Sequence, residues 1–330
     1  MAGSDPTAPP PAPPPAPLPP PSTLQGPGWQ PRTARHRDEV AQGLWGRFGG
    51  ACEVAPLREV LLTWPGEELR YVEEPAAWLM DGRPDLARLQ AQAEAVAAAF
   101  EAEGVRVHWL RPRRRPPPNL IFARDLFFMT PEGAVLARMA AGQRAGEEAF
   151  AAEALAGLHV PILATPTGTA TFEGADALWL DAAHVLVGTG RRTNAAGLAL
   201  LRGVLGEQGV QVVQVEVPAT SQHLLGALVF VAPGRALTLR PTPSITAALA
   251  AHGVEVLAVP VSEEVLRRRA VNLVCLGPDR VLMPAGCPQT RAWLEAQGLD
   301  CREVEVGEYV LAAGALGCLT GILRREGGPC

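Results

Sequence analysis

A unit of about 50 residues recurs along the chain, and this repeat constrains the fold more than any other feature. In each unit, two apolar runs joined by a short turn predict a β-hairpin. A helical stretch that ends near glycine follows, and then one more short strand. This order of hairpin, helix and strand occurs four times, with the hairpins in "DLFFMTPEGAVLARM", "ALWLDAAHVLVGTG", "LVFVAPGRALTL" and "LVCLGPDRVLMPAG".

A fifth unit is split between the two ends of the sequence. Near the start, "REVLLTWP", the helical "PDLARLQAQAEAVAAAFEAEG" and the strand "VRVHWL" lack one hairpin strand, which "CLTGILR" near the end can supply. Pairing of residues 318–324 with 57–64 would close a ring and remove exposed strand edges. We therefore predict an α/β fold, a five-bladed propeller of ββαβ units with pseudo-fivefold symmetry.

The first 37 residues differ in composition from the rest. The segment "PTAPPPAPPPAPLPPP" favours polyproline II and cannot bury a core. We expect a disordered proline-rich tail over residues 1–37 and a single catalytic α/β-propeller domain over residues 38–330. The role of the tail is left open.

Charge and composition exclude several classes of partner. The net charge of −5 argues against binding nucleic acid or an anionic membrane surface. The basic run "RPRRRPPP" lacks interleaved aromatic residues, so we interpret it as a solvated loop. All 29 basic residues are arginine, which excludes a lysine Schiff base. The six cysteines show no zinc-ligand spacing, so we predict no metal and no cofactor.

The sequence predicts a cytoplasmic protein. No apolar run approaches the length that spans a membrane, and no secretory hydrophobic segment opens the chain. A homodimer is left open.

Polar or reactive residues stand where the predicted hairpins begin: Asp125, Glu173, His223, Asn272 and Cys318, at intervals of 46 to 50 residues. Equivalent positions around a central axis lie at one end of it, so we expect these side chains to converge on one cavity. The alternative is that these are the ordinary polar residues found at strand starts in a repeat protein, and that Cys318 is a buried structural cysteine. We favour convergence because two carboxylates, an imidazole and a thiol form a coherent mechanism for modifying a guanidinium group.

These residue types suit a guanidinium substrate for a chemical reason. Its central carbon is delocalised and a poor electrophile, so its charge and plane must be fixed before attack. Paired carboxylates do this through charge-assisted hydrogen bonds, and a thiolate is a suitably soft nucleophile.

The segments "FARD", "FEGAD", "RRTN", "QHLLG", "AVN", "MPAG" and "GCLT" occur in the order and spacing of a known group. Over about residues 50–326, the chain resembles the guanidino-group-modifying enzymes, which comprise dimethylarginine dimethylaminohydrolases, arginine deiminases and amidinotransferases. It is most similar to the dimethylarginine dimethylaminohydrolases. The resemblance implies the five-bladed propeller known as the pentein fold.

The resemblance also implies roles for individual residues. Cys318 would be the nucleophile and His223 the general acid and base. Glu173 and Asp125 would grip the guanidinium, with Phe122 packed beside its plane.

Other matched positions would bind the carboxylate of the substrate or support the structure of the site. Arg144 and Arg192 match the arginines that bind the amino-acid carboxylate of the substrate. Asn272, Asp176 and Glu308 match residues that we interpret as structural support.

Two positions depart from the pattern of the group. Arginine deiminases have an aspartate two residues after the histidine, where this chain has Leu225, which argues against free arginine as the substrate. A glycine pair before the cysteine is replaced by Gly314 and Ala315.

The expected function is that of a hydrolase of C–N bonds in linear amidines, acting on a small guanidino compound. N-methylated arginine would give citrulline and an amine through a covalent thiouronium intermediate. An amidinotransferase, in which an amine replaces water, is the first alternative. A non-catalytic propeller that binds a partner, as in a ribosome anti-association factor, is the second, although a pure binder need not keep the Cys, His, Glu and Asp set.

Overall fold

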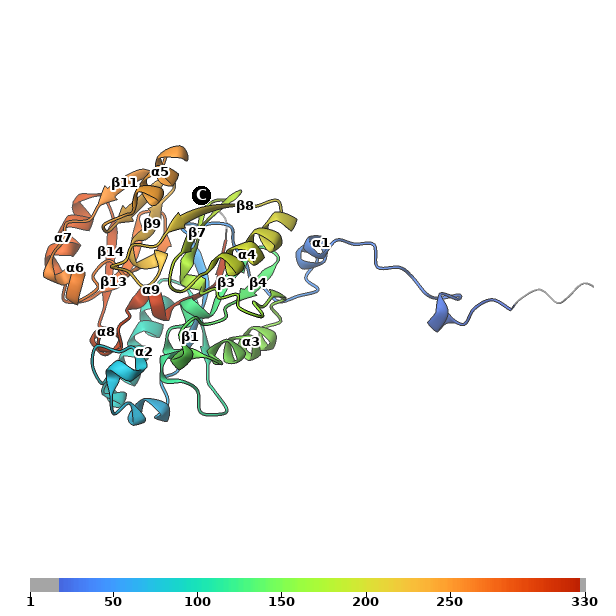
Figure 1. The fold of residues 1–330 in the computed structure, drawn as a ribbon, viewed down its shortest axis with the longest axis horizontal. Coiled ribbons are helices and arrows are strands. Elements are labelled where there is room, and N and C mark those ends of the chain that lie inside the picture. Colours follow the sequence, from blue (N-terminus) through green and yellow to red (C-terminus); the bar gives the residue numbers. More distant parts are fainter. Residues whose placement is uncertain (1–17, 327–330) are drawn as a thin grey trace, which may run out of the picture.

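The computed structural model describes residues 18–326, so residues 1–17 of the expected tail lie outside the described part of the chain. Residues 18–35 are mostly exposed and include one short 3-10 helix, Ser22–Leu24. Helix α1 (His36–Ala41) follows, with His36 Nε2 lying 2.8 Å from the carbonyl oxygen of Glu132. Figure 1 shows α1 and the preceding segment to one side of the main body.

The main body is a mixed α/β fold built from five separate three-stranded sheets. Each sheet pairs two strands antiparallel as a hairpin, or as its split equivalent, and adds a third strand parallel to one of them. The predicted order of hairpin, helix and strand is therefore confirmed. In sheet order the strands are β15 (Gly321–Arg325), β1 (Leu57–Thr63) and β2 (Arg106–Leu110); β3 (Phe127–Thr130), β4 (Gly133–Leu136) and β5 (Ile162–Ala164); β6 (Ala177–Asp181), β7 (His184–Thr189) and β8 (Gln211–Glu216); β9 (Leu228–Ala232), β10 (Arg235–Thr238) and β11 (Glu255–Ala258); β12 (Val274–Gly277), β13 (Arg280–Pro284) and β14 (Asp300–Val304).

One helix connects the second and third strands of each sheet. Side chains cap three of them, because Asp85, Asn194 and Thr242 each accept a hydrogen bond from a backbone N–H of the first turn. In Figure 1 these helices lie around the outside of the body and the strands lie toward its middle. The helices are α2 (Leu86–Ala102), α3 (Glu147–Gly157), α4 (Ala195–Glu207), α5 (Pro243–Ala251) and α7 (Pro288–Ala296).

The two ends of the globular part pair as the split repeat predicts. Strand β15 lies antiparallel to β1, with Val60 opposite Ile322 and Leu61 opposite Gly321. The start of the closing strand differs from the expectation, because residues 316–319 form a short helix, α9 (Leu316–Leu319), and β15 begins only at Gly321. The hydroxyl of Thr320 donates to the carbonyl oxygen of Leu316, which closes this helical turn before the strand starts.

Short helices that the sequence pattern did not indicate stand before the hairpins. Three 3-10 helices, Ala123–Leu126, Gly174–Asp176 and Leu224–Gly226, lead directly into or closely precede β3, β6 and β9. Two further short helices also follow third strands: α6 (Glu263–Arg267) lies between β11 and β12, and α8 (Gly307–Leu311) lies between β14 and α9. Strands β3, β4, β9 and β12 are buried along their whole length. The 3-10 helices before β3 and β9 therefore lie where the chain enters the core.

Over the described residues, every helix is too short or too polar to cross a lipid bilayer.

Candidate active site

The turns before the hairpins place polar side chains inside the protein. Asp125 lies within the 3-10 helix that precedes β3, and Glu173 and His223 each stand immediately before such a helix. All three residues are at least 95% buried. Burial of charged groups is costly unless they are paired, so these residues must find partners in the interior.

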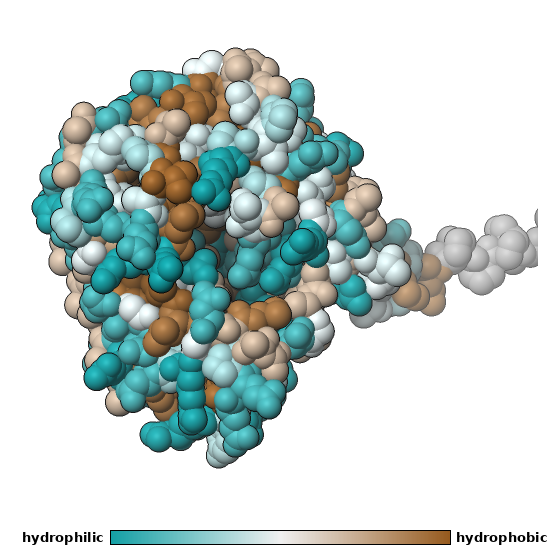
Figure 2. All heavy atoms as spheres, turned by 60° about the vertical axis from the view of Figure 1, so that its left-hand side comes forward, coloured by the Kyte–Doolittle hydropathy of each residue, from teal (hydrophilic) through white to brown (hydrophobic). Residues whose placement is uncertain are grey.

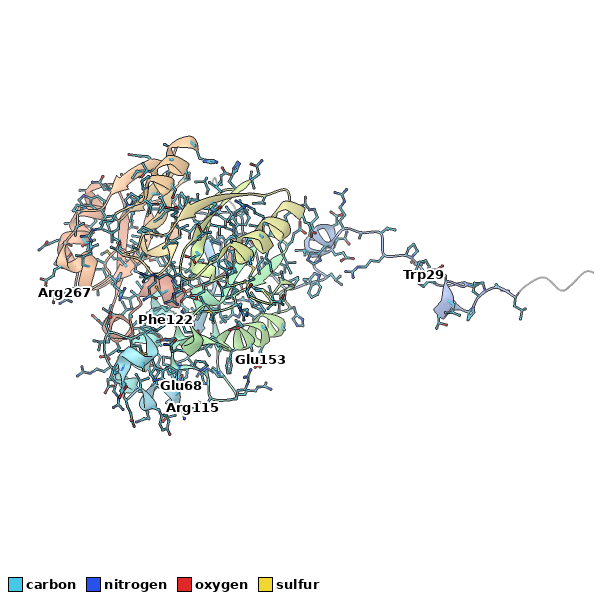
Figure 3. All side chains as sticks on the ribbon, viewed as in Figure 1. Trp29, Glu68, Arg115, Phe122, Glu153 and Arg267 are labelled. Carbon is cyan, nitrogen blue, oxygen red and sulfur yellow. The ribbon has the colours of Figure 1, made fainter. Side chains whose placement is uncertain are left out.

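A cavity of about 300 Å³ brings most of the predicted site residues together. A hollow with both hydrophilic and hydrophobic side chains around it is visible on one face in Figure 2. Figure 3 shows Phe122 in the interior of the body, close to α9. Predicted site residues that line the cavity are Phe122, Asp125, Arg144, Arg192, His223, Asn272 and Cys318.

Glu173 does not line this cavity and instead lies behind His223, with His223 Nε2 2.6 Å from Glu173 Oε2. The other carboxylate oxygen of Glu173 accepts a 3.0 Å hydrogen bond from the backbone N–H of Ala140. The remaining ring nitrogen, His223 Nδ1, lies 3.7 Å from Asp125 Oδ1. The geometry therefore directs Glu173 at the imidazole and leaves Asp125 to face the cavity.

The pKa values of His223 and Glu173 are both strongly shifted. Burial by itself would lower the pKa of His223, but the charge of Asp125 and the hydrogen bond and charge of Glu173 raise it to about 9. Burial would raise the pKa of Glu173, but its hydrogen bond to His223, that group's charge and the charges of Arg144 and Arg192 lower it to about 2. At neutral pH the pair is an imidazolium and a carboxylate.

Cys318 is held by Asn272 through two hydrogen bonds. The side-chain amide of Asn272 donates to the sulfur over 3.1 Å, and its oxygen accepts from the backbone N–H of Cys318 over 3.2 Å. Burial and the charge of Asp125 raise the pKa of the thiol, against the lowering effect of the Asn272 hydrogen bond. The resting thiol is therefore protonated at neutral pH.

Gly314 explains how Phe122 fits beside this turn. A Cβ atom at residue 314 would lie 2.1 Å from Cε1 of Phe122, so only glycine allows the ring to pack there. The glycine that remains of the usual pair is thus required by a ring that lines the cavity.

Arg144 is fully engaged in the interior. It donates to Asp125 Oδ2 over 2.6 Å and to both carboxylate oxygens of Glu147 over 2.8 to 3.1 Å. Burial would lower the pKa of Arg144, but the charges of Glu147 and Asp125 raise it well above its usual value. Its guanidinium therefore fixes Asp125 and has little freedom to meet a substrate carboxylate.

Arg192 is less constrained than Arg144. Its Nη1 lies 3.4 Å from both carboxylate oxygens of Glu173, and its Nη2 donates to Gln222 over 3.1 Å.

The predicted supporting residues are found in structural contacts. Asp176 accepts hydrogen bonds from the hydroxyl of Thr193 and from the backbone N–H of Leu224, next to His223. Burial raises the pKa of Asp176 to about 6. Glu308 lies outside the cavity lining and accepts from the backbone N–H of Asp85, at the start of α2.

Sequence reasoning missed Asn119, which lines the cavity. Its amide donates to the carbonyl oxygen of Trp78 over 2.7 Å, whereas its Oδ1 is buried and has no hydrogen-bond partner among the described residues. Asp125 Oδ1 is in the same condition. Two unpaired acceptors at one cavity indicate a ligand that donates hydrogen bonds. The sequence offered no signal for Asn119, because it stands within an apolar run rather than at a hairpin start.

The carboxylates and imidazole also satisfy the spacing of a metal site. One ligand atom from each of Asp125, Glu173 and His223 lies within 4.8 Å of the others. The guanidinium groups of Arg144 and Arg192 lie within 4 Å of these carboxylates and would repel a metal dication, so we do not assign a metal to this set.

Comparison with known proteins bears on the resemblance seen in the sequence. A family model described as arginine deiminase matches residues 113–225. An uncharacterised protein of Aeropyrum pernix is 32% identical over 155 residues, and this match covers 46% of the present chain and 53% of that protein. The chain thus spans about half the length of this curated relative.

Solved structures share the fold over most of the chain. A dimethylarginine dimethylaminohydrolase of Pseudomonas aeruginosa, in complex with citrulline, is 22% identical, with a TM-score of 0.66, over 80% of this chain and 98% of that one. An amidinotransferase of Microseira wollei is 19% identical, with a TM-score of 0.69, over 87% and 98% of the two chains. The N-terminal domain of a cyanobacterial arginine dihydrolase is 20% identical, with a TM-score of 0.68, over 79% and 96%. The resemblance to the guanidino-group-modifying superfamily is confirmed, and the similarity to these structures establishes a common fold.

Proposed function

We propose that this chain is a cysteine-dependent hydrolase that acts on the guanidinium carbon of an arginine-like substrate, with N-methylated arginine giving citrulline and an amine. The observation that carries the proposal is that Cys318, His223, Asp125 and Asn119 line one cavity, and that Asp125 and Asn119 each have one buried oxygen with no hydrogen-bond partner among the described residues. The arginine deiminase family match and the fold shared with guanidino hydrolases and amidinotransferases support the same reaction class.

We also propose that the five sheets are the blades of a five-bladed propeller. Contacts between successive sheets support this, because β15 touches β3, the turns before β3 and β6 touch, and the turns before β6 and β9 touch. Strand β12 then touches both β9 and β1, so the contacts return to the first sheet. Such a ring would place the five hairpin starts at one end of a common axis.

The substrate guanidinium fits the unpaired acceptors. Asp125 Oδ1 and Asn119 Oδ1 would accept its N–H groups, so that two buried oxygens that now accept no hydrogen bond would each gain one when it binds. Phe122 would pack against the plane of the group. Leu225 also lines the cavity and offers no acceptor, which favours a guanidinium bearing an alkyl substituent on one nitrogen.

The substrate itself would activate the thiol. Cys318 is a neutral thiol at rest, since burial and the charge of Asp125 raise its pKa. A bound guanidinium cation favours the thiolate, so the thiol proton passes to solvent water as the substrate enters, because His223 is already protonated. The thiolate sulfur then adds to the guanidinium carbon, forming a C–S bond and a tetrahedral adduct.

His223 would supply the proton for the leaving amine. Its Nε2 is committed to Glu173, which leaves Nδ1, on the side of Asp125, for proton transfer. Nδ1–H protonates the departing nitrogen, the C–N bond breaks, and a thiouronium remains on Cys318.

The second half of the reaction reverses the role of His223. The neutral imidazole takes a proton from water as its oxygen adds to the thiouronium carbon. The C–S bond then breaks as the remaining hydroxyl proton of the adduct passes to solvent, which releases a neutral urea-type product and restores the thiolate. An amidinotransferase would share every step up to the thiouronium and would then admit an amine in place of water.

The experiment that tests the function is a substrate screen with product identification. The purified protein is incubated with N-methylated arginines, arginine, agmatine and guanidino acids, each with and without an added amine such as glycine, and products are followed by mass spectrometry. Citrulline and methylamine or dimethylamine from methylated arginine, independent of the added amine, are expected. Transfer of the amidino group to the amine would establish the amidinotransferase, and the absence of any product would favour the non-catalytic binder.

A further inference from the structure

Three arginines line the cavity, and they differ in how far their guanidinium groups are already engaged. Arg144 is almost fully buried and bound by two carboxylates, and Arg192 is held by Glu173 and Gln222. Arg269 has one side-chain hydrogen bond among the described residues, from its Nη2 to Asp81 Oδ2 at 2.9 Å. Arg269 therefore has the most donor capacity left for a ligand.

Arg269 is coupled to the reactive thiol through the backbone. It follows helix α6 and its carbonyl oxygen accepts from the backbone N–H of Asn272, the residue that holds Cys318. The charge of Arg269 also lowers the pKa of the Cys318 thiol, against the larger effect of burial. The guanidinium thus acts within the same cavity as the nucleophile and not on a remote surface.

The ion pair between Arg269 and Asp81 joins two parts of the chain that both border the cavity. Leu79, two residues before Asp81, lines the cavity from one segment, while Leu266 and Arg269 line it from another. The side chain of Arg269 is 29% exposed and that of Asp81 67% exposed. An exposed ion pair of this kind contributes little stability, so its arginine can exchange one carboxylate for another at low cost.

We propose that Arg269 binds the anionic group at the end of the substrate remote from the guanidinium, exchanging its contact with Asp81 for the substrate. Arg144, to which the resemblance gives this task, instead holds Asp125 in position for the guanidinium. The inference rests on the proposed function, because it specifies the substrate class as a guanidino compound that carries a carboxylate.

The chemistry of the two partners agrees with this assignment. The planar guanidinium of arginine matches a carboxylate with two parallel hydrogen bonds, which a monodentate contact with Asp81 does not use. Asp125 at one part of the cavity attracts a cation, and Arg269 at another part attracts an anion. A zwitterionic guanidino acid satisfies both charges.

Steady-state kinetics of four variants test the proposal. Each variant is assayed with the guanidino acid that the wild type consumes and with the same compound lacking its carboxylate, as an agmatine derivative compares with an arginine derivative. Arg269→Ala is expected to raise KM for the acid by about tenfold or more, with a smaller change in kcat and little change for the analogue. Arg144→Ala is expected to impair both substrates alike, because Asp125 loses its partner.

Two further variants separate binding from structure. Asp81→Asn frees Arg269 and is expected to leave KM for the acid unchanged or lower it, whereas a purely structural ion pair would make Asp81→Asn resemble Arg269→Ala. Arg267→Ala is the matched control, because Arg267 is the last residue of α6, two residues before Arg269, and its side chain is about 80% exposed and points outward in Figure 3. Equal loss for both substrates in Arg269→Ala, or the same loss in Asp81→Asn, would overturn the proposal.

A second measurement does not depend on the proposed function. The rate at which anionic iodoacetate alkylates Cys318 is compared with the rate for neutral iodoacetamide, with the modified residue located by peptide mass. If Arg269 attracts anions into the cavity, the rate with iodoacetate divided by the rate with iodoacetamide falls several-fold in Arg269→Ala. The same ratio stays at the wild-type value in Arg267→Ala. An unchanged ratio contradicts the proposal even if no guanidino substrate is found, and a lowered ratio supports the anion site when the reaction itself proves different.

Discussion

His223 Nε2 and Glu173 Oε2 are 2.6 Å apart, in a contact where both side chains are buried. This contact has a direct consequence for the reaction, because together with the larger effect of the Asp125 charge it raises the pKa of His223 to about 9 and keeps the imidazole protonated at neutral pH. His223 can therefore begin the cycle as an acid, which the departure of an amine requires.

Replacing Glu173 with glutamine is expected to separate this effect from substrate binding. Without the carboxylate, the pKa of His223 falls, so the alkaline limb of the pH–rate profile moves from near pH 9 to lower pH. We expect kcat to fall by roughly 10²-fold at neutral pH. The profile of kcat against pH checks this, and a limb that stays in place in Glu173→Gln would show that another group titrates.

The same pair predicts how stability depends on pH. The folded-state pKa of His223, about 9, lies above its usual value of 6.5, so its contribution is complete below about pH 6.5 and is lost as pH rises through 9. The difference in Tm between the wild type and His223→Gln should therefore shrink between pH 6.5 and pH 9.5. A difference that stays constant over this range would contradict the assigned pKa.

Gly314→Ala tests whether the turn before Cys318 is shaped by Phe122. The added methyl group would overlap the ring, with 2.1 Å to Cε1, and must displace Phe122 from the cavity wall. We expect a loss of about 1–3 kcal/mol in the free energy of unfolding together with reduced activity. Gly142→Ala is the control, because no atom lies within 4 Å of its added Cβ. Equal effects of the two substitutions would show that the ring relocates without cost.

The repeat alone predicted the hairpins, the connecting helices and the pairing of β1 with β15, because apolar periodicity and turn residues are local signals. It did not predict the short helices before the hairpins. The helical turn that carries Cys318 is set by hydrogen bonds to Ala315 and Leu316, and nothing in the apolar run around it distinguishes a turn from a strand.

The sequence predicted which residues form the candidate site but not which of their side chains contact one another. Regular spacing brought Asp125, His223 and Cys318 to one cavity, as expected. Spacing carries no information on which side chain faces which, so the commitment of Glu173 to His223 and of Arg144 to Glu147 emerged only from the three-dimensional arrangement.

Deletion of residues 1–35 tests the expected domain boundary. The contacts of His36 and Arg37 with Glu132 remain in the shortened chain. We expect Tm and activity to stay close to those of the full chain. A loss of several degrees or of most of the activity would show that the proline-rich segment packs against the globular part or regulates it.

The central claim is that Cys318 forms a covalent bond to the substrate carbon, and intact-mass measurement during turnover tests it most directly. Cys318→Ser is expected to fold normally and to lose turnover by several orders of magnitude, because a serine hydroxyl stays protonated and attacks a guanidinium poorly. Cys275→Ser is the control, since Cys275 is a buried free thiol whose pKa is raised to about 11, first of all by burial. In the wild type quenched with substrate, and more strongly in His223→Gly if hydrolysis suffers more than attack, we predict an added mass that maps to the peptide containing Cys318. Normal turnover by Cys318→Ser, or an adduct on Cys275 or Cys287, would contradict the mechanism.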